Sequence, residues 1–208
     1  MAAKAPSKSS ASAADADPES RASRFMRSAL AILGETGRTD FTVLEVVERS
    51  KTSLRAFYQH FATKDELLLA LVEKIMADAT DAWRAEVDPL SSADALRRLI
   101  ERISAPAESS TQDSINRGLT YYNDHLLETR PKEFAKVLAP LHSLVSDILR
   151  RGVADGTFRA DLDVDTDAAI LMQTVLGALR LRDLGDQLNG VPIEGSHLYT
   201  FCVRGLSA

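Results

Sequence analysis

Hydrophobic residues recur at intervals of three and four along almost the whole chain, which is the periodicity of α-helices that bury one face. Alternating apolar and polar runs bounded by hairpin turns, which would indicate β-strands, are nearly absent. The pattern therefore predicts an all-α protein of about nine helices. The expected helices cover residues 21–33, 43–49, 54–60, 64–87, 93–103, 115–128, 131–153, 166–184 and 196–205.

Capping signals mark three helix starts in the first third of the chain. Thr42 and Glu45 have the S/T-x-x-E spacing of a capping box, in which each side chain bonds the backbone of the other residue. Thr63 and Glu66 repeat this spacing. Ser53 is the expected N-cap of the short helix between the two boxes. These signals predict two short helices followed by a long one.

Glycine residues and polar stretches set the expected helix ends. Gly34 and Gly37 are predicted to end the first helix, and Gly156 to stop the seventh, because glycine tolerates the left-handed conformation that often follows a helix. Residues 104–114, with the sequence SAPAESSTQDS, are predicted to form a loop. Residues 154–165, with the sequence ADGTFRADLDVD, are predicted to form a turn-rich connector.

The first three helices have the layout of a helix-turn-helix, with residues 50–53, SKTS, as the turn. In this arrangement the third helix enters the major groove of DNA and the second lies across the phosphate backbone. Phe57 and Phe61 are four residues apart, so they are expected to hold the third helix to the core and leave its other face free. The candidate DNA-binding residues are Thr42, Lys51, Ser53, Leu54, Arg55, Ala56, Tyr58, Gln59, His60 and Lys64.

The residue types on this free face suit duplex DNA. Arg55 can pair with guanine, Gln59 with adenine, and Ala56 can contact a thymine methyl group. The side chains suited to phosphate oxygens are Tyr58, His60 and Lys64. Two alternatives stay open: the stretch is a surface helix with aromatic core anchors, or His60 is only a helix C-cap.

Residues 41–67, FTVLEVVERSKTSLRAFYQHFATKDEL, resemble the DNA-binding domain of the tetracycline-repressor (TetR) family of bacterial regulators. The resemblance is strong over residues 21–72. Beyond them it rests on the helix layout and on the connector residues Gly156, Phe158 and Arg159. The matching positions in the domain are Thr42, Ser53, Phe57, Tyr58, His60, Phe61, Lys64, Glu66 and Leu67.

The turn departs from the pattern of the resembled family, which is usually Ala-Gly-Val. Here Ser50, Lys51 and Thr52 occupy it, and a lysine at positive φ costs about 1 kcal/mol relative to glycine. Either the turn is strained or Lys51 contacts a phosphate. Leu54 replaces a residue that is often basic or small, so the DNA contact of that residue is not expected here. Arg55 replaces a frequent glycine and can supply another contact.

The eighth helix is apolar nearly all round, so it must be covered on every side. One side can face its own domain, and the resemblance implies that the last two helices of each chain pair in a four-helix homodimer bundle. A two-fold dimer would present two third helices to a palindrome. The alternative is one well-buried helix of a monomer. The candidate interface residues are Ala168, Ala169, Met172, Val175, Leu176, Leu179, Leu198, Phe201 and Cys202.

The resemblance also implies that residues 88–164 hold a pocket for a small, largely apolar effector molecule. Such a pocket needs apolar walls and a few placed polar groups. Any one candidate is alternatively plain core or plain surface. The candidates are Trp83, Tyr121, Tyr122, His125, Leu126, His142, Leu144 and Ile148.

Charge is unevenly divided along the 208-residue chain, whose formal net charge is -5. Residues 21–66 carry eight Lys and Arg against six Asp and Glu, whereas residues 67–208 carry fifteen against twenty-one. This division fits a DNA-binding domain at 21–66 and an effector-binding and dimerisation domain at 67–208. Residues 1–20 are rich in Ala, Ser and Pro and are expected to be a disordered tail.

Other function classes find little support. Cys202 is the only cysteine, so no internal disulfide forms, and a reducing cytoplasm is the expected compartment. No stretch is apolar enough for a membrane span, and no HExxH, GxSxG or Gly-rich phosphate loop indicates an enzyme, a metal site or a cofactor. The sequence therefore predicts a ligand-responsive transcriptional regulator that represses from operator DNA. The alternative is an architectural DNA-binding protein without a ligand.

Overall fold

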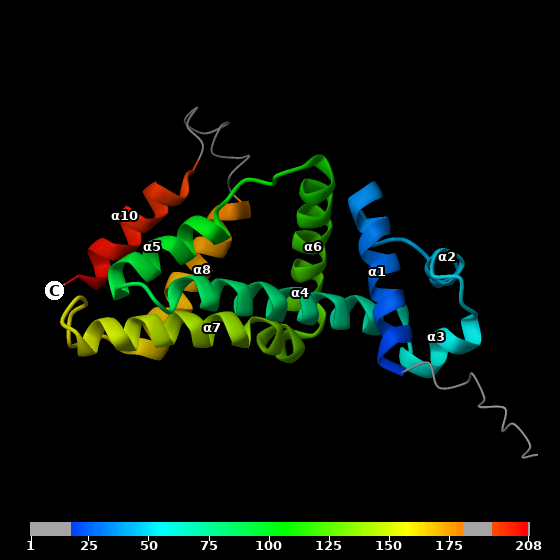
Figure 1. Ribbon diagram of the computed structural model, residues 1–208, viewed down its shortest axis with the longest axis horizontal. Helices are drawn as coiled ribbons and strands as arrows, with labels where there is room; N and C mark the ends of the chain where they lie inside the picture. The colour runs from blue at the N-terminus through cyan, green and yellow to red at the C-terminus, as the bar shows by residue number, and fades with distance from the viewer. Residues whose placement is uncertain (1–17, 181–192, 208) are drawn as a thin grey trace, which may run out of the picture.

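The computed structural model describes residues 18–180 and 193–207, and these residues form nine helices and no strand (Figure 1). The all-α prediction is confirmed. One isolated bridge pairs Phe158 with Ser207. The helices are α1 (Pro18–Thr36), α2 (Val43–Arg49), α3 (Leu54–His60), α4 (Lys64–Val87), α5 (Ser92–Ile103), α6 (Ser110–Thr129), α7 (Pro131–Ala154), α8 (Val164–Arg180) and α10 (Gly195–Leu206).

The bounds of α2 and α3 match the predicted residues, but α1 is longer than expected at both ends. It begins at Pro18, because proline is well suited to the first turn of a helix. It also continues through Gly34 to Thr36, so the prediction that Gly34 ends it was wrong. Gly34 is buried, and a Cβ atom there would lie 2.7 Å from Cγ2 of Thr111 on α6. The chain leaves the helix at Gly37, whose φ is 66°.

The start of α6 also differs from the prediction. The helix begins at Ser110, so the last five residues of the predicted loop at 104–114 are helical. The side chain of Ser109 caps it by accepting a hydrogen bond from the backbone N–H of Gln112 at 3.1 Å. The polar first turn contains no apolar residue, so hydrophobic periodicity did not reveal it. Residues 181–184, the predicted end of the eighth helix, lie outside the described residues.

The head of the molecule, formed by α1, α2 and α3, has an aromatic centre. The ring of Phe25 from α1 lies 5.4 Å from that of Phe57 and 6.3 Å from that of Phe61, measured between centroids. Both contacts are edge-on, a favourable geometry for aromatic pairs. Phe25 and Phe57 are completely buried. This cluster fixes α3 to α1 through the inner face of α3.

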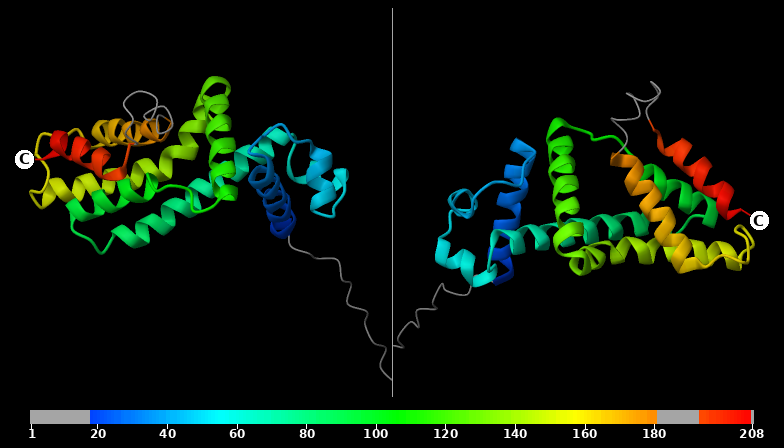
Figure 2. Two further views of the ribbon diagram at one scale, coloured as in Figure 1. Left: turned by 90° about the horizontal axis from the view of Figure 1, so that it is seen from above. Right: turned by 180° about the vertical axis from the view of Figure 1, so that it is seen from behind.

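The head lies at one end of the molecule, and α5, α8 and α10 gather at the other (Figure 2). The two long helices α4 and α7 join these ends, lie side by side and run in the same direction (Figure 1). Polar contacts at a constant sequence offset connect them: Arg84 with Asp147, and Arg151 with the carbonyl of Asp88. The helix α6 crosses α4 next to the head and contacts α1.

Candidate nucleic-acid interface

The capping box that starts α2 forms as predicted. The backbone N–H of Glu45 donates to Oγ1 of Thr42 at 3.2 Å, and the backbone N–H of Thr42 donates to Oε2 of Glu45 at 2.6 Å. These bonds from Thr42 lower the pKa of Glu45, so the carboxylate stays ionised at the helix N-terminus. The Thr42 hydroxyl also donates to Glu45, at 2.8 Å. Thr42 is exposed, but its backbone N–H and its hydroxyl are already hydrogen-bonded to Glu45 within the capping box.

The helix α3 divides into an anchored face and an exposed face. Ser53 caps its start by accepting from the backbone N–H of Ala56 at 3.1 Å. Phe57 is completely buried, and Ala56 is half-buried and packs against the core. On the other side, the exposed fraction is 46% for Leu54 and 58% for Tyr58. The outer face of α3 consists of Leu54, Arg55, Tyr58 and Gln59, all of which are exposed.

Lys51, in the turn before α3, has a φ of 53°. Among the described non-glycine residues it alone lies in the left-handed region, and this conformation costs about 1 kcal/mol for a residue with a side chain. The turn needs it because the backbone N–H of Thr52 donates back to the carbonyl of Val47 at 3.0 Å. The Lys51 side chain is exposed beside the first turn of α3.

His60 and Lys64 lie deeper than the rest of the candidate residues. Lys64 is half-buried, and its Nζ donates to the carbonyl of Thr39 at 2.9 Å and lies 5.5 Å from the centroid of the Phe41 ring. His60 is half-buried at the last position of α3, where Phe61 rather than His60 is the C-cap. Both residues therefore help to hold the head together, whatever else they contact.

Three arginines at the start of α1 extend the basic surface, and the sequence analysis did not single them out. Arg21, Arg24 and Arg27 are spaced by three and surround Phe25, whose ring contacts the aromatic residues of α3. They lie on the helix that contacts α3. Within residues 18–180 and 193–207, none of the three forms an ion pair. The signal available in the sequence was this regular basic spacing just before the helix-turn-helix.

Ion pairs neutralise other charges in the head. Arg38 pairs with Asp40, and Arg49 donates to Glu35, with Nη1 at 2.7 Å from Oε2. The hydrogen bond from Arg49 lowers the pKa of Glu35. The basic side chains of the head without an ion pair to any described residue are Arg21, Arg24, Arg27, Lys51, Arg55 and Lys64. This half of the molecule therefore presents unpaired positive charge around α3, as phosphate binding requires.

The eight candidate effector residues do not gather at one cavity. Tyr121 and His125 are exposed on α6, and the exposed fraction of Tyr121 is 72%. Tyr122 and Leu126 are buried on the opposite side of the same helix. Trp83 and His142 are half-buried, and Nε2 of His142 lies 3.0 Å from the carbonyl oxygen of Asp165. Only Leu144 and Ile148 line the cavity described next.

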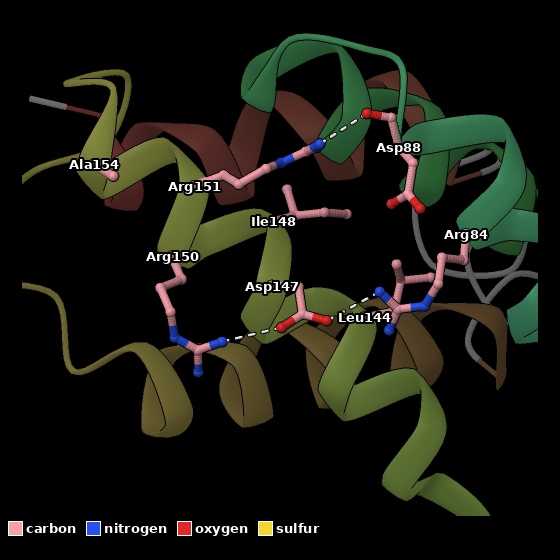
Figure 3. Close-up of a pocket in the computed structure, with 8 residues that line it drawn as sticks. All are labelled: Arg84, Asp88, Leu144, Asp147, Ile148, Arg150, Arg151 and Ala154. Carbon is pink, nitrogen blue, oxygen red and sulfur yellow. Dashed lines mark hydrogen bonds and ion pairs between the residues drawn. The ribbon is translucent and has the colours of Figure 1, made fainter.

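A cavity of about 430 Å³ lies between the last turns of α4 and α7 (Figure 3). Nη1 of Arg84 and Nη1 of Arg150 each donate to Asp147 at 3.0 Å, and Nη1 of Arg151 donates to the carbonyl of Asp88 at 2.9 Å. Two carboxylates and two helix C-termini balance the three guanidinium groups. The charges around the cavity are therefore nearly balanced, and Leu144 and Ile148 give it apolar surface. Its lining residues are Arg84, Asp88, Leu144, Asp147, Ile148, Arg150, Arg151 and Ala154.

The candidate interface residues on α8 and α10 separate into two groups. Ala168, Met172, Val175 and Leu198 are buried within the chain itself, and their place in an interface stays a prediction. An all-apolar helix does not reveal which side its own core covers. Ala169, Leu176, Leu179 and Cys202 are half-buried. Two apolar side chains of these helices point outward: Phe201, which is 71% exposed, and Ile170, which is 59% exposed. Phe201 was among the predicted interface residues, whereas Ile170 was not.

In the described part of the chain, the His, Cys, Asp and Glu side chains form no group of three or more that could hold a metal ion. None of its helices combines the length and apolar character needed to cross a membrane.

Residues 25–71 match the family model described as bacterial regulatory proteins, tetR family. Over 194 residues the chain is 26% identical to the HTH-type transcriptional repressor KstR2 of Mycolicibacterium smegmatis. The aligned region covers 87% of this chain and 88% of the relative. The matched family segment spans the head and the first turns of α4.

Solved structures share the fold along most of the chain. FadR, a fatty acid degradation regulator from Bacillus halodurans, has a TM-score of 0.69 at 15% identity, covering 88% of this chain and 98% of that chain. FadR from Bacillus subtilis, in complex with stearoyl-CoA, has a TM-score of 0.67 at 14% identity and covers 88% of this chain and 95% of that chain. The helix-turn-helix head and the helical body thus define a DNA-binding transcriptional regulator. The match over residues 25–71 places the head in the tetR family of bacterial regulators, and the similarity to KstR2 extends over 87% of the chain.

Proposed function

We propose that the protein is a repressor that binds a palindromic operator as a homodimer and leaves it when a small-molecule effector binds. The outer face of α3 carries this proposal. Leu54, Arg55, Tyr58 and Gln59 are exposed there, while Phe57 anchors the opposite face. Arg55 and Gln59 have the donor geometry that reads guanine and adenine in the major groove.

Phosphate contacts would surround these base contacts. Arg21, Arg24 and Arg27 on α1 and Lys51 in the turn before α3 supply positive charge that has no ion pair among the described residues. The phenol of Tyr58 is exposed and can donate to a phosphate oxygen. Such contacts fix the register of the protein on DNA and make its affinity depend on salt.

The outward side chains of α8 and α10 support a homodimer. Ile170 and Phe201 expose apolar surface on neighbouring helices, and Ala169, Leu176 and Cys202 beside them are half-buried. A two-fold axis through this surface would bring the same patch of each protomer together. Two copies of α3 would then reach successive major grooves, which repeat at about 34–36 Å.

The effector is proposed to be a small, largely apolar molecule that binds the body. The complex of Bacillus subtilis FadR with stearoyl-CoA shows that this fold can bind a ligand with a long apolar acyl chain, and the cavity of this chain has the apolar residues Leu144 and Ile148 in its lining. The effector must bind the DNA-incompetent conformation more tightly. A release of about 100-fold requires about 2.7 kcal/mol of coupling between the two sites.

Selection of bound duplexes from a random library, repeated at two salt concentrations, tests the proposal. A palindrome with two half-sites is the expected result. Salt-sensitive binding without any preferred sequence would instead identify an architectural DNA-binding protein, and absence of binding at low salt would contradict both readings. Sedimentation of the free protein tests the dimer separately.

A further inference from the structure

The contact between α6 and the first turn of α4 contains a buried tyrosine. The hydroxyl of Tyr122 lies 2.8 Å from Oδ1 of Asp65 and 3.0 Å from the carbonyl oxygen of the same residue. Only 3% of Tyr122 is exposed. Burial and the hydrogen bond to Asp65 raise the pKa of Tyr122 above its ordinary value, so the hydroxyl stays protonated and donates.

Arg130 reinforces the same contact from the junction between α6 and α7. Its Nη1 donates to Oδ2 of Asp65 at 2.8 Å and to Oε1 of Glu66 at 2.9 Å, while Nη2 lies 3.5 Å from Oε1 of Glu133. The hydrogen bonds to Asp65 and Glu66 raise the pKa of Arg130. Both carboxylates of the first turn of α4 are therefore held by one guanidinium, and Asp65 accepts from two different side chains.

A second contact joins α6 to the head at the end of α1. Gly118 is buried, and a Cβ atom there would lie 2.6 Å from Cδ2 of Leu33 and 3.3 Å from the carbonyl oxygen of Gly37. The two helices therefore approach closely at this position, and a larger residue would have to displace the Leu33 side chain. Together with the Tyr122 and Arg130 bonds, this contact attaches α6 to the head at the end of α1 and at the start of α4.

The start of α4 is mechanically important because α4 follows the reading helix closely. His60 ends α3 and Lys64 begins α4, with the tightly packed Phe61 between them. Any rotation of the first turn of α4 relative to the body must therefore turn α3 with it. In a dimer, the same rotation would change the separation of the two reading helices.

We infer that Tyr122 and Arg130 are positioning residues that set the spacing between half-sites which the dimer accepts. The inference rests on the proposed function, since it requires two reading heads on one palindrome. A network that only stabilised the fold would leave the spacing preference of the folded dimer unchanged. If instead the network fixes the direction of α3, the dimer would bind tightly only to palindromes with one spacing between the half-sites.

The test uses the full chain and the selected palindrome, with one or two base pairs inserted or removed between the half-sites. Each base pair moves a half-site by about 3.4 Å along the DNA axis and also rotates it. We expect wild-type affinity to fall by about tenfold or more for a change of one base pair, because a rigid protein forces the DNA to deform.

The variants Tyr122→Phe and Arg130→Gln remove the contacts and keep most of the side-chain volume. We expect both substitutions to flatten the spacing profile, which is the dependence of affinity on the distance between the half-sites. The same one-base-pair change should then weaken binding by about threefold or less, within the range of DNA deformation energies. Tyr121→Phe is the matched control, because it removes the same atom from an exposed neighbour on α6 and should keep the wild-type profile. Asp65→Asn tests the network from the other side if Tyr122→Phe fails to fold.

The outcomes separate this inference from the proposed function. If the wild type selects no palindrome and has no spacing preference, the proposed function as a dimeric DNA-binding repressor is wrong, and the inference is wrong as well. If the wild type has a sharp spacing profile and the folded variants of Tyr122, Arg130 and Asp65 all retain it, only the inference is overturned. A flattened profile in these variants and a sharp one in Tyr121→Phe supports it.

Discussion

Nζ of Lys64 donates a hydrogen bond to the carbonyl oxygen of Thr39 at 2.9 Å, which ties the first turn of α4 to the connection between α1 and α2. The two residues are 25 positions apart in the sequence. The bond therefore closes the head against the helix that follows it. It also uses one of the three ammonium donors and leaves two for other partners.

Lys64→Met should show both uses of the ammonium group. We expect the free energy of unfolding to fall by about 1–2 kcal/mol, because the Thr39 carbonyl loses a charged donor. We also expect the slope of log affinity against log salt to fall by about one, because a phosphate contact is lost. Chemical denaturation and binding at several salt concentrations measure the two effects. Lys74→Met, which removes an exposed lysine of α4 paired with Asp78, is the control.

The stability and the salt slope of Lys64→Met test the two roles of Lys64 separately. A stability loss with an unchanged salt slope would restrict Lys64 to holding the head together. A reduced slope without any stability loss would show that the bond to Thr39 contributes nothing to folding.

Lys51 should be unfavourable for folding and favourable for binding. Its φ of 53° suits glycine, so Lys51→Gly should raise the free energy of unfolding by up to about 1 kcal/mol. The same substitution should weaken binding to every DNA sequence alike, because the exposed ammonium is proposed to contact a phosphate. Thermal unfolding and binding to specific and random duplexes provide the measurements.

Lys51→Ala is the matched variant for this position. It removes the ammonium but keeps a Cβ atom in the left-handed conformation, so it should weaken DNA binding as much as Lys51→Gly without gaining stability. If both variants bind DNA like the wild type, Lys51 makes no phosphate contact. If alanine stabilises the fold as much as glycine does, the turn is not strained.

Local signals in the sequence were sufficient for α2 and α3 and insufficient for the attachment of the head to the body. The side chains of Thr42, Ser53 and Thr63 fix helix starts within three residues of themselves, so capping patterns predicted the bounds of α2 and α3 and the start of α4. The Tyr122 bond to Asp65 spans 57 residues. No local pattern encodes such a pairing, because it depends on how α6 crosses α4.

The same limit applies to surfaces that depend on tertiary packing. Periodicity showed that α8 is apolar on every side, but only the packing of the chain shows that Val175 faces the core and Ile170 faces outward. The arginines of α1 were visible in the sequence as charge. The packing of their helix against α3 depends on the contact of Phe25 with Phe57, which joins two distant segments.

Arg55 should determine sequence preference. It is exposed on the outer face of α3 and has no ion pair within the described ranges, so its guanidinium is free to read a guanine. Arg55→Ala should cost about 1–3 kcal/mol at one base pair and relax the preference there. Affinities for the selected operator and for its single-base variants measure this effect.

Arg27→Ala is the matched control for Arg55→Ala. Arg27 is also exposed and unpaired, but it lies on α1 and is proposed to contact phosphate. Its loss should weaken all sequences equally and lower the salt slope by about one. Equal weakening across sequences for Arg55→Ala would make Arg55 a backbone contact instead.

Ile170→Glu should separate the protomers without unfolding them. Ile170 is 59% exposed, so a charge there has little cost in the isolated chain, whereas at a symmetric interface it would place two carboxylates in apolar surroundings. Sedimentation should show a monomer with an unchanged helical circular dichroism spectrum. Affinity for the palindrome should fall to that of a single half-site, because the second head no longer binds as part of the same molecule.

Tyr121→Glu is the control for this substitution, since Tyr121 is an exposed aromatic residue on α6, outside the two helices of the proposed interface. It should leave both the dimer and the affinity for the palindrome unchanged. An intact dimer in Ile170→Glu would place the interface on another face of the body. A monomer that still binds the palindrome as tightly as the wild type would show that the two heads bind independently, and would remove the basis for a spacing preference.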